Sequence, residues 1–432
     1  MKTLLLLAGQ SKRFWPLSEK PFFPICGKAL LSHVIDRLKQ AGCDDVILIG
    51  GKHNLEEAKR LFPDLPMVEQ ERLELGMRGA LLSALPKVGN EPVLIVSAND
   101  IIEPDAYEMT VSAGAKCDGA ILGQIVSRYF PGGYLSHKDN HMTSIIEKPG
   151  AGNEPSDMVT IVCHYHTDPQ ALLESLSGVD ESKDDGYEQA LGKLFATKNY
   201  TPVPYAGLWQ AVKYPWHLLH LLPALLQELP SGRTRHKESE IHETAVIEGN
   251  VVIEEGVRIL PHAVIIGPST IGKGTIVGNN ALVRGSSIGE KCVIGFGTEV
   301  KNSVLASHVW THSTYIGDSV IGENVSFGAG CVTGNLRLDE GEISSQVGGD
   351  KVETGLTKFG TAIGDHCRIG IHVGINPGVK IGRDTFVGGG CMVGQDIPDQ
   401  SFVSMKGGEI VVRPNTGKAP HPAEREKYKK MI

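Results

Sequence analysis

An apolar residue recurs at every sixth position through most of the second half of this 432-residue chain. In the first run the residues are six apart in Ile247, Ile253, Ile259, Ile265, Ile271, Val277 and Val283. After a one-residue slip, the same spacing continues in Ile288, Ile294 and Val300. A second run repeats the spacing: Ile363, Ile369, Ile375, Ile381, Val387 and Val393. Small residues and glycine lie between these positions. A six-residue period is typical of a left-handed parallel β-helix, whose coils have three short sides with inward-pointing aliphatic residues at the corners.

The two runs are separated by a segment that abandons the period. Residues 336–360 are polar and rich in glycine. A solenoid expels such an insertion as an external loop, and long ordered loops often carry function. We therefore predict a β-helix over residues 242–408 with this loop outside it. Residues 409–432 contain several prolines and end in a Lys/Glu-rich stretch, which predicts a C-terminal surface tail.

The first half of the chain has a different pattern, in which apolar strands alternate with amphipathic helices. Strands are predicted at Val46–Ile49, Val93–Ser97 and Ala120–Ile125, and helices at Leu55–Leu61 and Gly79–Leu85. This alternation predicts an α/β, Rossmann-like domain with a mostly parallel sheet and ligands at the carboxyl ends of its strands. A Leu-rich helix at Pro215–Leu229 closes the domain. The predicted domain therefore spans residues 1–229, and residues 230–241 form a linker.

Charge and cysteine usage limit the classes of partner. A formal net charge of −8 provides no basic field, so we expect no nucleic-acid partner. No apolar run approaches the length of a membrane span, so we expect no membrane partner. The eight cysteines show neither CxxC pairs nor zinc spacing, which favours a reducing compartment, the cytoplasm. A polyanionic substrate would then have to be met by a local cluster of cations.

Such a cluster lies near the N-terminus. The apolar run Leu4–Leu7 is long enough for one buried strand, and it breaks at Gly9 into a polar loop that carries Lys12, Arg13 and Lys20. A strand, a glycine turn and a cation-rich loop form a phosphate cradle. Backbone N–H groups face the oxyanions, and Lys and Arg neutralise them.

Two further motifs carry charged residues at strand ends. The apolar stretch Val93–Val96 ends near Asp100, and a carboxylate at the tip of a buried strand is placed to hold Mg²⁺ on phosphates. The second motif is Glu147-Lys148-Pro149, which also follows an apolar pair. Charged side chains at strand ends suit a ligand that carries phosphates, because they can neutralise its charge or hold its counter-ion.

The N-terminal loop, L-A-G-x-S-x-R-x-x-P-L followed by K-P, resembles the signature of sugar-1-phosphate nucleotidylyltransferases, which have a glycosyltransferase-A type domain. The resemblance implies that the loop holds a nucleoside triphosphate while a sugar-1-phosphate attacks its α-phosphorus. It implies catalytic roles for Arg13 and Lys20 and a metal-ligand role for Asp100. It implies nucleotide contacts from Ala8, Gly9, Ser11, Lys12, Glu74 and Gly76. It implies sugar-phosphate contacts from Gly133, Glu147 and Lys148.

The chain departs from this family in the pocket residues. Gly76-Met77-Arg78 replaces the usual G-T-A turn, and Glu74 stands where a Gln commonly reads the base. The sugar-pocket Asn is missing around Val159–Cys163. The resemblance therefore leaves the base and the sugar open, with UTP or dTTP expected and GTP or CTP not excluded.

The position of the family's second metal carboxylate is also altered, because it holds Ala211 and is followed by Lys213 in place of a glycine. Three interpretations stay open. Lys213 replaces part of the metal's charge, Asp100 holds the metal with water, or the domain has lost activity. Asp184 and Asp185 could also supply a carboxylate.

The second half carries its own resemblance. The stretches Gly297–Ser303, His312–Asp318 and Gly328–Asn335 resemble the acetyltransferase half of the bifunctional glucosamine-1-phosphate acetyltransferase/N-acetylglucosamine-1-phosphate uridylyltransferases, archaeal forms above all. The resemblance implies that His312 is the general base that takes a proton from the attacking sugar amine. It implies an acceptor site of Arg284, Lys301, Tyr315, Asn335 and, on the expelled loop, Lys358.

With the first domain, this likeness covers nearly the whole chain. It implies a homotrimer with acetyl-CoA lying along the solenoid. The expected activities are synthesis of a UDP- or dTDP-sugar, best UDP-N-acetylglucosamine, and acetylation of an amino sugar-1-phosphate. Two alternatives remain: a nucleotidylyltransferase whose β-helix only oligomerises or regulates, and an inactive regulatory homologue.

Overall fold

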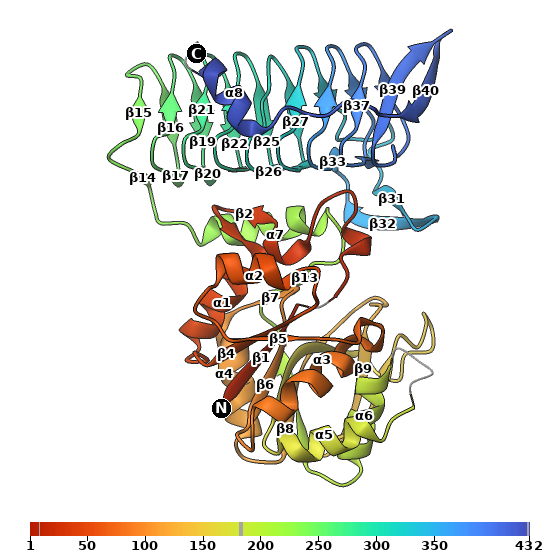
Figure 1. Ribbon diagram of the computed structural model, residues 1–432. Coiled ribbons are helices and arrows are strands. Elements are labelled where there is room, and N and C mark those ends of the chain that lie inside the picture. Colours follow the sequence, from red (N-terminus) through yellow and green to blue (C-terminus); the bar gives the residue numbers. More distant parts are fainter. Residues whose placement is uncertain (8, 181–184, 430–431) are drawn as a thin grey trace. The chain divides into compact units, whose positions relative to one another are not determined.

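The chain folds into two compact units, whose elements are labelled in Figure 1. The computed structural model describes residues 1–7, 9–180, 185–429 and 432. Unit 1 comprises Met1–Gln10 and Leu30–Ala211, and unit 2 comprises Ser11–Ala29 and Val212–Ile432. This division differs from a boundary at residue 229, because the cationic loop and helix α7 (His217–Gln227) both belong to unit 2.

Unit 1 is built on a nine-stranded sheet with the order β10-β9-β11-β6-β1-β4-β5, and β8 and β12 extend it beside β11. Its strands are β1 (Lys2–Leu6), β4 (Val46–Gly50), β5 (Met67–Glu69), β6 (Val93–Ser97), β8 (Gly119–Ile125), β9 (Gly133–Lys138), β10 (His141–Glu147), β11 (Met158–His166) and β12 (Tyr200–Tyr205). Strand β1 runs parallel to β4 and β6, whereas β11 runs antiparallel to β6 and β8.

The sheet is therefore mixed, and the expectation of a mostly parallel sheet is corrected on the β11 side. The edge of the sheet beyond β11 is antiparallel as well, since β9 and β10 form a hairpin across Asp139 and Asn140. Both turn residues have positive φ, 48° and 64°, the backbone that two-residue hairpin turns require. Aspartate and asparagine tolerate that conformation better than other side chains.

Helices cover the sheet and close its core. They are α1 (Leu30–Gln40), α2 (Leu55–Leu61), α3 (Gly76–Ala84), α4 (Pro104–Gly114), α5 (Pro169–Ser177) and α6 (Gly186–Phe195). The face of α1 with Leu30, Val34 and Leu38 is buried, as its four-residue spacing predicts. A separate small sheet pairs β7 (Asp100–Ile102) with β13 (Trp209–Ala211). Among the residues that the structure describes, no helix is long and apolar enough to cross a bilayer.

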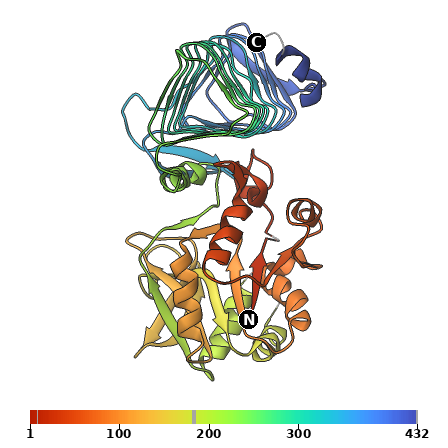
Figure 2. The ribbon, with the colours of Figure 1, turned by 90° about the vertical axis from the view of Figure 1, so that its left-hand side faces the viewer.

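Unit 2 is a parallel β-helix with three-sided coils, seen end-on in Figure 2. The first side has β14 (Arg233–Arg235), β17 (Val251–Ile253), β20 (Ser269–Ile271), β23 (Ser287–Ile288), β26 (Val304–Leu305), β28 (Val320–Ile321), β33 (Thr361–Ile363) and β36 (Val379–Ile381). The second side has β16 (Val246–Glu248), β19 (Val264–Ile266), β22 (Leu282–Arg284), β25 (Glu299–Lys301), β27 (Tyr315–Gly317), β30 (Val332–Thr333), β35 (Gly374–Ile375) and β38 (Met392–Val393).

The third side has two parts that bridges at Trp310 connect. These are β15 (Glu240–Ile241), β18 (Arg258–Ile259), β21 (Ile276–Val277) and β24 (Val293–Ile294), then β29 (Ser326–Phe327), β34 (Arg368–Ile369), β37 (Phe386–Val387), β39 (Ser401–Lys406) and β40 (Glu409–Pro414). Strand β40 folds back antiparallel onto β39. The segment after it returns along the solenoid, ending in α8 (Pro422–Lys429), where the Arg425 guanidinium lies 4.1 Å from the centre of the Trp310 ring.

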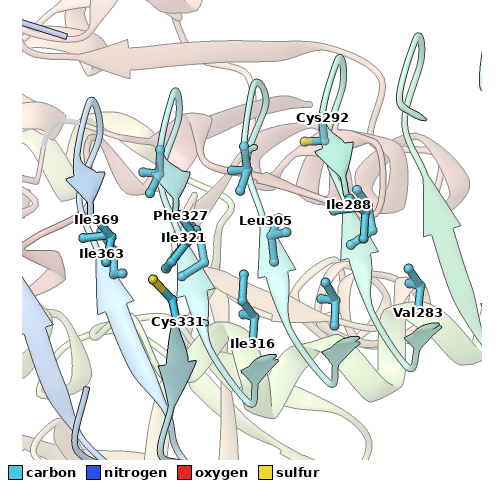
Figure 3. Close-up of a cluster of buried hydrophobic side chains, with 14 of the residues drawn as sticks. Val283, Ile288, Cys292, Leu305, Ile316, Ile321, Phe327, Cys331, Ile363 and Ile369 are labelled. Carbon is cyan, nitrogen blue, oxygen red and sulfur yellow. The ribbon is translucent and has the colours of Figure 1, made fainter. Parts of the chain in front are cut away.

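The six-residue apolar period fills the solenoid core and confirms the β-helix. Aliphatic side chains from successive coils stack on one another, as Figure 3 shows for Ile288, Leu305, Ile321 and Ile363, which pair in register on neighbouring strands. Val246 pairs with Val264, eighteen residues on, but Glu299 pairs with Tyr315, only sixteen residues on. The coils thus shorten to sixteen residues around the residues that the sequence singles out for acetyl transfer, and they do so again near the end of the solenoid, where Phe386 pairs with Phe402.

One insertion interrupts the coils. Between β30 and β33 the chain leaves the solenoid as the antiparallel hairpin β31 (Ile343–Val347) and β32 (Asp350–Leu356). Its two-residue turn is Gly348-Gly349, with φ of 59° and 97°. Glycine suits both positions because positive φ costs it nothing.

Candidate functional sites

A pocket of about 520 Å³ lies at the carboxyl ends of β1 and β6 in unit 1. It is lined by Leu6, Gly9, Gln10, Gln70, Leu73, Glu74, Gly76, Met77, Ala80, Ser97, Asn99 and Val162. Three predicted nucleotide-binding residues, Gly9, Glu74 and Gly76, thus share one pocket. Ala8, the fourth predicted in this unit, lies outside the described residues. The volume falls in the range of small-molecule sites.

Two polar side chains of this pocket were missed by sequence reasoning. The Oδ1 atom of Asn99 is buried and has no hydrogen-bond partner among the described residues. Such orphaned acceptors are rare in folded proteins and point to a ligand or water. Gln70 is buried, and its Nε2 donates to the carbonyls of Arg72 and Gly76 at 2.9 and 2.8 Å, which fixes the turn that leads into α3. Asn99 was detectable, because it follows a buried strand and precedes Asp100.

The candidate metal ligand Asp100 begins β7 and pairs directly with Ala211 across the small sheet. The indole Nε1 of Trp209 donates to Asp100 Oδ1 at 2.9 Å. Side chains directly opposite each other on antiparallel strands have Cβ atoms about 5 Å apart. A carboxylate at position 211 would therefore reach the same site, but alanine supplies no ligand.

The remaining donors still fit magnesium. Mg²⁺ is commonly held by one or two carboxylates together with substrate phosphates and water, so Asp100 alone provides the minimum. The described part of the chain contains no cluster of three His, Cys, Asp or Glu side chains that could hold a metal without substrate. Of the alternative carboxylates, Asp185 accepts a hydrogen bond from Gln189 Nε2 at 2.6 Å, and Asp184 lies outside the described residues.

The predicted sugar-phosphate residues meet at one end of the β9–β10 hairpin, where Gly133 pairs with Glu147. A Cβ atom at position 133 would lie 3.3 Å from Glu147 Oε2 and 3.0 Å from Thr160 Cγ2, so any other residue there would crowd these two side chains. Lys148 has a φ of 45°, and its Nζ lies 2.8 Å from Glu147 Oε1. Gly133, Glu147 and Lys148 thus form one group in unit 1, with Thr160 beside them.

A buried chain of hydrogen bonds leads away from Thr160. Its hydroxyl lies 2.9 Å from His164 Nε2, and His164 Nδ1 lies 2.8 Å from the Tyr187 hydroxyl. That hydroxyl is also 3.2 Å from His166 Nε2, while His166 Nδ1 is 2.7 Å from the Tyr200 hydroxyl. Burial lowers the pKa of both histidines to about 3, so both rings stay neutral in the folded state.

Burial raises the pKa of one nearby carboxyl group, whereas it lowers the pKa of the two histidines. Burial, reinforced by the charge of Glu147, raises the pKa of Glu188 to about 7. Lys148 opposes this rise. The carboxyl of Glu188 can therefore carry a proton near neutral pH and act as a hydrogen-bond donor.

The cationic loop belongs to unit 2. The Ser11 hydroxyl donates to Glu19 Oε2 at 3.0 Å and accepts from the backbone N–H of Lys20 at 3.2 Å. Lys20 Nζ donates to the carbonyl of Val212 at 3.1 Å. Lys12 and Arg13 are exposed. Ser11 and Glu19 thus close the loop and present its two adjacent cations to solvent.

Four of the predicted acceptor-site residues gather on the second side of the solenoid. Arg284 and Lys301 occupy the same register position on neighbouring strands. Asn335 Nδ2 donates to the Tyr315 hydroxyl at 3.2 Å and to Asp318 Oδ2 at 2.5 Å. Asp318 also lies 3.7 Å from Lys301 Nζ.

Two carboxylates that sequence reasoning missed balance the cations of this cluster. Arg284 Nε donates to Glu299 Oε1 at 3.0 Å, and Lys301 is paired with Asp318. Glu299 was detectable because it lies two residues before Lys301 on the same face of the strand. Cations beside carboxylates suit a ligand that carries both a phosphate and an amine.

His312 and Lys358 lie close to this cluster in the chain. His312 is exposed on the corner that leads into β27, three residues before Tyr315, and its carbonyl accepts from the Thr314 hydroxyl at 3.0 Å. In the part of the chain that the structure describes, its ring forms no hydrogen bond or ion pair with the cluster. Lys358 is exposed and forms a bridge with Leu336, next to the Phe359 N–H that donates to the Asn335 carbonyl at 3.1 Å.

Comparison with known proteins gives matches over both units. Residues 3–236 match the MobA-like NTP transferase domain, residues 233–335 the GMPPB C-terminal domain, and residues 360–395 the bacterial transferase hexapeptide with six repeats. The chain is 32% identical to a bifunctional sugar-1-phosphate nucleotidylyltransferase/acetyltransferase of Sulfurisphaera tokodaii, over 92% of this chain and 98% of that protein. It is 31% identical to the bifunctional protein GlmU of Methanococcus maripaludis, over 95% and 99% of the two chains. It is 29% identical to the protein of that name from Methanocaldococcus jannaschii, over 96% and 99%.

Proposed function

The chain belongs to the family of bifunctional sugar-1-phosphate nucleotidylyltransferase/acetyltransferases with a MobA-like NTP transferase domain, and on this basis we propose that it catalyses both reactions. The N-terminal half of the chain joins a sugar-1-phosphate to a nucleoside triphosphate. The β-helix acetylates an amino sugar-1-phosphate from acetyl-CoA. The proposed product of the two steps is UDP-N-acetylglucosamine.

The proposal of nucleotidyl transfer rests mainly on one observation. The pocket at the ends of β1 and β6 holds the buried Oδ1 of Asn99, which has no partner in the described chain. An unsatisfied acceptor in a pocket of this size fits a donor on a base or a ribose. The three predicted residues of the same pocket, Gly9, Glu74 and Gly76, support the same ligand.

The chemistry requires little covalent help from the protein. A phosphate oxygen of the sugar-1-phosphate forms a bond to the α-phosphorus, and the bond from that phosphorus to pyrophosphate breaks. Lys12, Arg13 and Lys20 neutralise the phosphates, which favours the charge that develops in an in-line transfer. Glu147 orients sugar hydroxyls and Lys148 the sugar phosphate. Mg²⁺, when bound, adds charge neutralisation, and Asp100 is the carboxylate that would hold it.

On the solenoid the reaction is acyl transfer. The amine nitrogen of the sugar bonds to the thioester carbonyl carbon, the carbon–sulfur bond of acetyl-CoA breaks, and His312 takes the proton from nitrogen. Arg284 and Lys301 bind the phosphate of the acceptor. Tyr315, with Asn335 bonded to its hydroxyl, contacts the sugar, and Lys358 adds a further cation from the expelled loop.

We propose that the protein forms a homotrimer through its β-helix. One register line on the second side presents exposed apolar side chains at Val246, Val332 and Met392, which are 44%, 48% and 62% exposed. Exposed apolar residues in one line favour an interface. Sedimentation equilibrium would test this, and a monomer at micromolar concentration would contradict it.

We place the protein in the cytoplasm because all eight cysteines are free thiols. Free thiols persist where glutathione keeps them reduced. Fractionation of the source cells with an antibody to the chain tests this, and recovery outside the cell would contradict it.

The nucleotidyl reaction is tested by pyrophosphate release with Mg²⁺, crossing four nucleoside triphosphates with glucose-, mannose-, glucosamine- and N-acetylglucosamine-1-phosphate. We expect the fastest release with UTP and N-acetylglucosamine-1-phosphate. Asn99→Ala should raise the KM for the nucleotide about tenfold, the cost of one lost hydrogen bond to a buried group. Asn90→Ala, at an exposed asparagine, is the matched control. Silence with every pair would leave the domain as an inactive homologue.

The acetyl transfer is tested by release of the CoA thiol from acetyl-CoA and glucosamine-1-phosphate. Loss of a general base costs typically 10²–10⁴-fold, so His312→Ala should lose about this much of kcat. His372→Ala removes an exposed corner histidine of a later coil and should match the wild type. No thiol release by the wild-type protein would reduce the β-helix to an oligomerisation or regulatory domain.

A further inference from the structure

A bulge in β11 brings Thr160 to the buried histidines of unit 1. Thr160 pairs with Gly123 of β8 and His164 pairs with Ile121, so four residues of β11 advance against only two of β8. Side chains four residues apart on a regular strand are separated by about 13 Å. The bulge removes this separation, because Thr160 Oγ1 lies 2.9 Å from His164 Nε2. Bulges next to active sites commonly re-aim one side chain, and here that side chain is Thr160.

Thr160 lies beside the predicted sugar-phosphate residues and is half-buried. Its methyl group and Glu147 Oε2 both border the space that Gly133 leaves open by lacking a side chain. Val162, in the same bulge, lines the pocket of about 520 Å³ at the carboxyl ends of β1 and β6. One bulge therefore supplies a residue to each half of the proposed nucleotidyl-transfer site: Thr160 on the sugar side and Val162 on the nucleotide side.

The buried network that begins at Thr160 has only two possible directions. It consists of Thr160, His164, Tyr187, His166 and Tyr200, joined in that order by four hydrogen bonds. Burial lowers the pKa of both histidines to about 3, so each ring is neutral and has one N–H donor and one acceptor nitrogen. The Tyr187 hydroxyl has one hydrogen, so it donates to one ring and accepts from the other. Every other bond of the network follows from that choice.

The two directions differ at the ends of the network. When Tyr187 donates to His166, the other nitrogen of that ring donates to Tyr200. At the opposite end, Thr160 then donates to His164. When Tyr187 donates to His164 instead, every bond is reversed, so that Tyr200 is a donor and Thr160 is an acceptor.

Burial of Tyr200 selects the second direction. Tyr200 is 3% exposed, and its hydroxyl forms one hydrogen bond in the described part of the chain, at 2.7 Å from His166 Nδ1. Burial also raises the pKa of Tyr200, so the hydroxyl keeps its hydrogen. If this hydroxyl accepted from His166, its hydrogen would be buried without an acceptor, which folded proteins rarely allow. Tyr200 therefore donates to His166, and His164 donates to Thr160.

This direction leaves the hydroxyl hydrogen of Thr160 available to a ligand. The oxygen accepts from His164, and the hydroxyl has no other hydrogen-bond partner among the described residues. We propose that Thr160 donates this hydrogen to a hydroxyl or amide oxygen of the sugar-1-phosphate and thereby determines which sugars react. A protonated amine in the same place offers only donors, so it would be rejected.

The four other members of the network are positioning residues, because they act on the sugar only through Thr160. Together they hold the threonine as a donor. The role of Thr160 in the reaction rests on the proposed function, whereas the direction of the network does not.

The direction of the network is tested by nuclear magnetic resonance of the full chain with isotope-labelled histidine at neutral pH. The nitrogen shifts of each ring show which nitrogen carries the proton, and the signals are assigned from their loss in His164→Gln and His166→Asn. We expect a protonated Nε2 and an unprotonated Nδ1 in both rings. A protonated Nδ1 in either ring would make Thr160 a donor to His164 and would overturn the proposal.

The contact with the sugar is tested by a matched pair of variants. Thr160→Val keeps the shape of the side chain and removes its hydroxyl, whereas Thr160→Ser keeps the hydroxyl. In pyrophosphate release with N-acetylglucosamine-1-phosphate, Thr160→Val should lower kcat/KM about tenfold, the effect of one lost hydrogen bond, and Thr160→Ser should stay near the wild type. Equal values for the two variants would contradict the contact.

Analogues of the sugar separate this contact from a merely structural effect of valine. The set consists of the monodeoxy forms of the sugar-1-phosphate, including the one without the acetamido group. With one of them the wild type should lose about tenfold in kcat/KM, and Thr160→Val should lose nothing further with the same analogue. Parallel losses in the two proteins with every analogue would overturn the proposal.

Failure of the proposed function gives a different result. A wild-type chain that releases no pyrophosphate from any pair of substrates would refute the enzyme activity, and with it the role of Thr160 in the reaction, while protonated Nε2 atoms would still establish the direction of the network. An active wild type in which no analogue distinguishes it from Thr160→Val would overturn the contact alone.

Discussion

Mild acid should destabilise unit 1 through the two buried histidines of β11. The pKa of His164 and of His166 is about 3 in the folded state and about 6.5 in an unfolded chain. Between these values the unfolded chain binds protons that the folded chain does not. Stability is therefore complete above the unfolded pKa and is lost as the pH falls below about 6.5.

The size of the loss follows from these values. At pH 5 an unfolded histidine is almost fully protonated, and the linkage costs about 2 kcal/mol for each side chain relative to pH 8. This figure hardly changes for any folded pKa below about 4. The two histidines together remove about 4 kcal/mol, a large share of the 5–15 kcal/mol that typically stabilises a domain. Glu188 returns roughly 2.5 kcal/mol, because its raised pKa favours the folded state as the pH falls toward the unfolded value.

The assay is hydrogen exchange of the slowest amides of β11, corrected for intrinsic rates at pH 8 and pH 5. The double variant His164→Gln/His166→Asn keeps one hydrogen-bonding nitrogen at each position but does not titrate. Its loss of opening free energy between pH 8 and pH 5 should be about 4 kcal/mol smaller than that of the wild type. His137→Gln, at an exposed histidine of the same sheet, is the control. Equal losses in the double variant and the wild type would refute the reasoning, whatever their stabilities at pH 8.

Three other substitutions test single residues of the sites. Ala211→Asp places a carboxylate opposite Asp100 and should lower the Mg²⁺ concentration for half-maximal pyrophosphate release several-fold; an unchanged metal titration would argue against a metal at Asp100. Lys301→Met should raise the KM for the amino sugar phosphate about tenfold in acetyl transfer, whereas Arg258→Met, on another side of the solenoid, should not; equal KM values would remove Lys301 from the acceptor site. Glu188→Gln should stabilise unit 1 to urea by about 3 kcal/mol at pH 8, where the buried carboxyl is ionised, and by less than about 1 kcal/mol at pH 5; a gain that does not depend on pH would contradict the raised pKa.

The sequence predicts the fold best where the spacing of residues along the chain determines the structure. The period that places Ile253, Ile271 and Ile288 in the solenoid core can be read directly from the sequence, because every coil must place an aliphatic side chain in the core. The ladder that brings Arg284 beside Lys301 follows from the same spacing. The sequence alone could not predict which carboxylates form ion pairs with these two cations, since such pairing depends on side-chain rotamers as well as on strand register.

Contacts between distant segments were beyond sequence reasoning. The indole Nε1 of Trp15 donates to Asp399 Oδ1 at 2.8 Å, although almost the whole chain separates them and no local pattern marks them as partners. The same holds for the hydrogen bond from His220 Nε2 to the Thr354 carbonyl, 2.9 Å long, which ties α7 to the expelled hairpin. The change in composition near residue 230 marks where the repeat begins, but not which segments fold together.

The attachment of Ser11–Ala29 to the solenoid has a consequence for how this chain can be inherited and engineered. Besides the bond to Asp399, the backbone N–H of Cys26 donates to Ser287 Oγ at 2.7 Å. A fragment that ends at residue 229 would keep the cationic loop and lose Ser287 and Asp399, the partners that hold it. Exchanging the C-terminal half for that of a distant relative would place that relative's residues against the loop at the positions of Ser287 and Asp399. Recombination at the visible sequence boundary would therefore separate the loop from the coils that hold it.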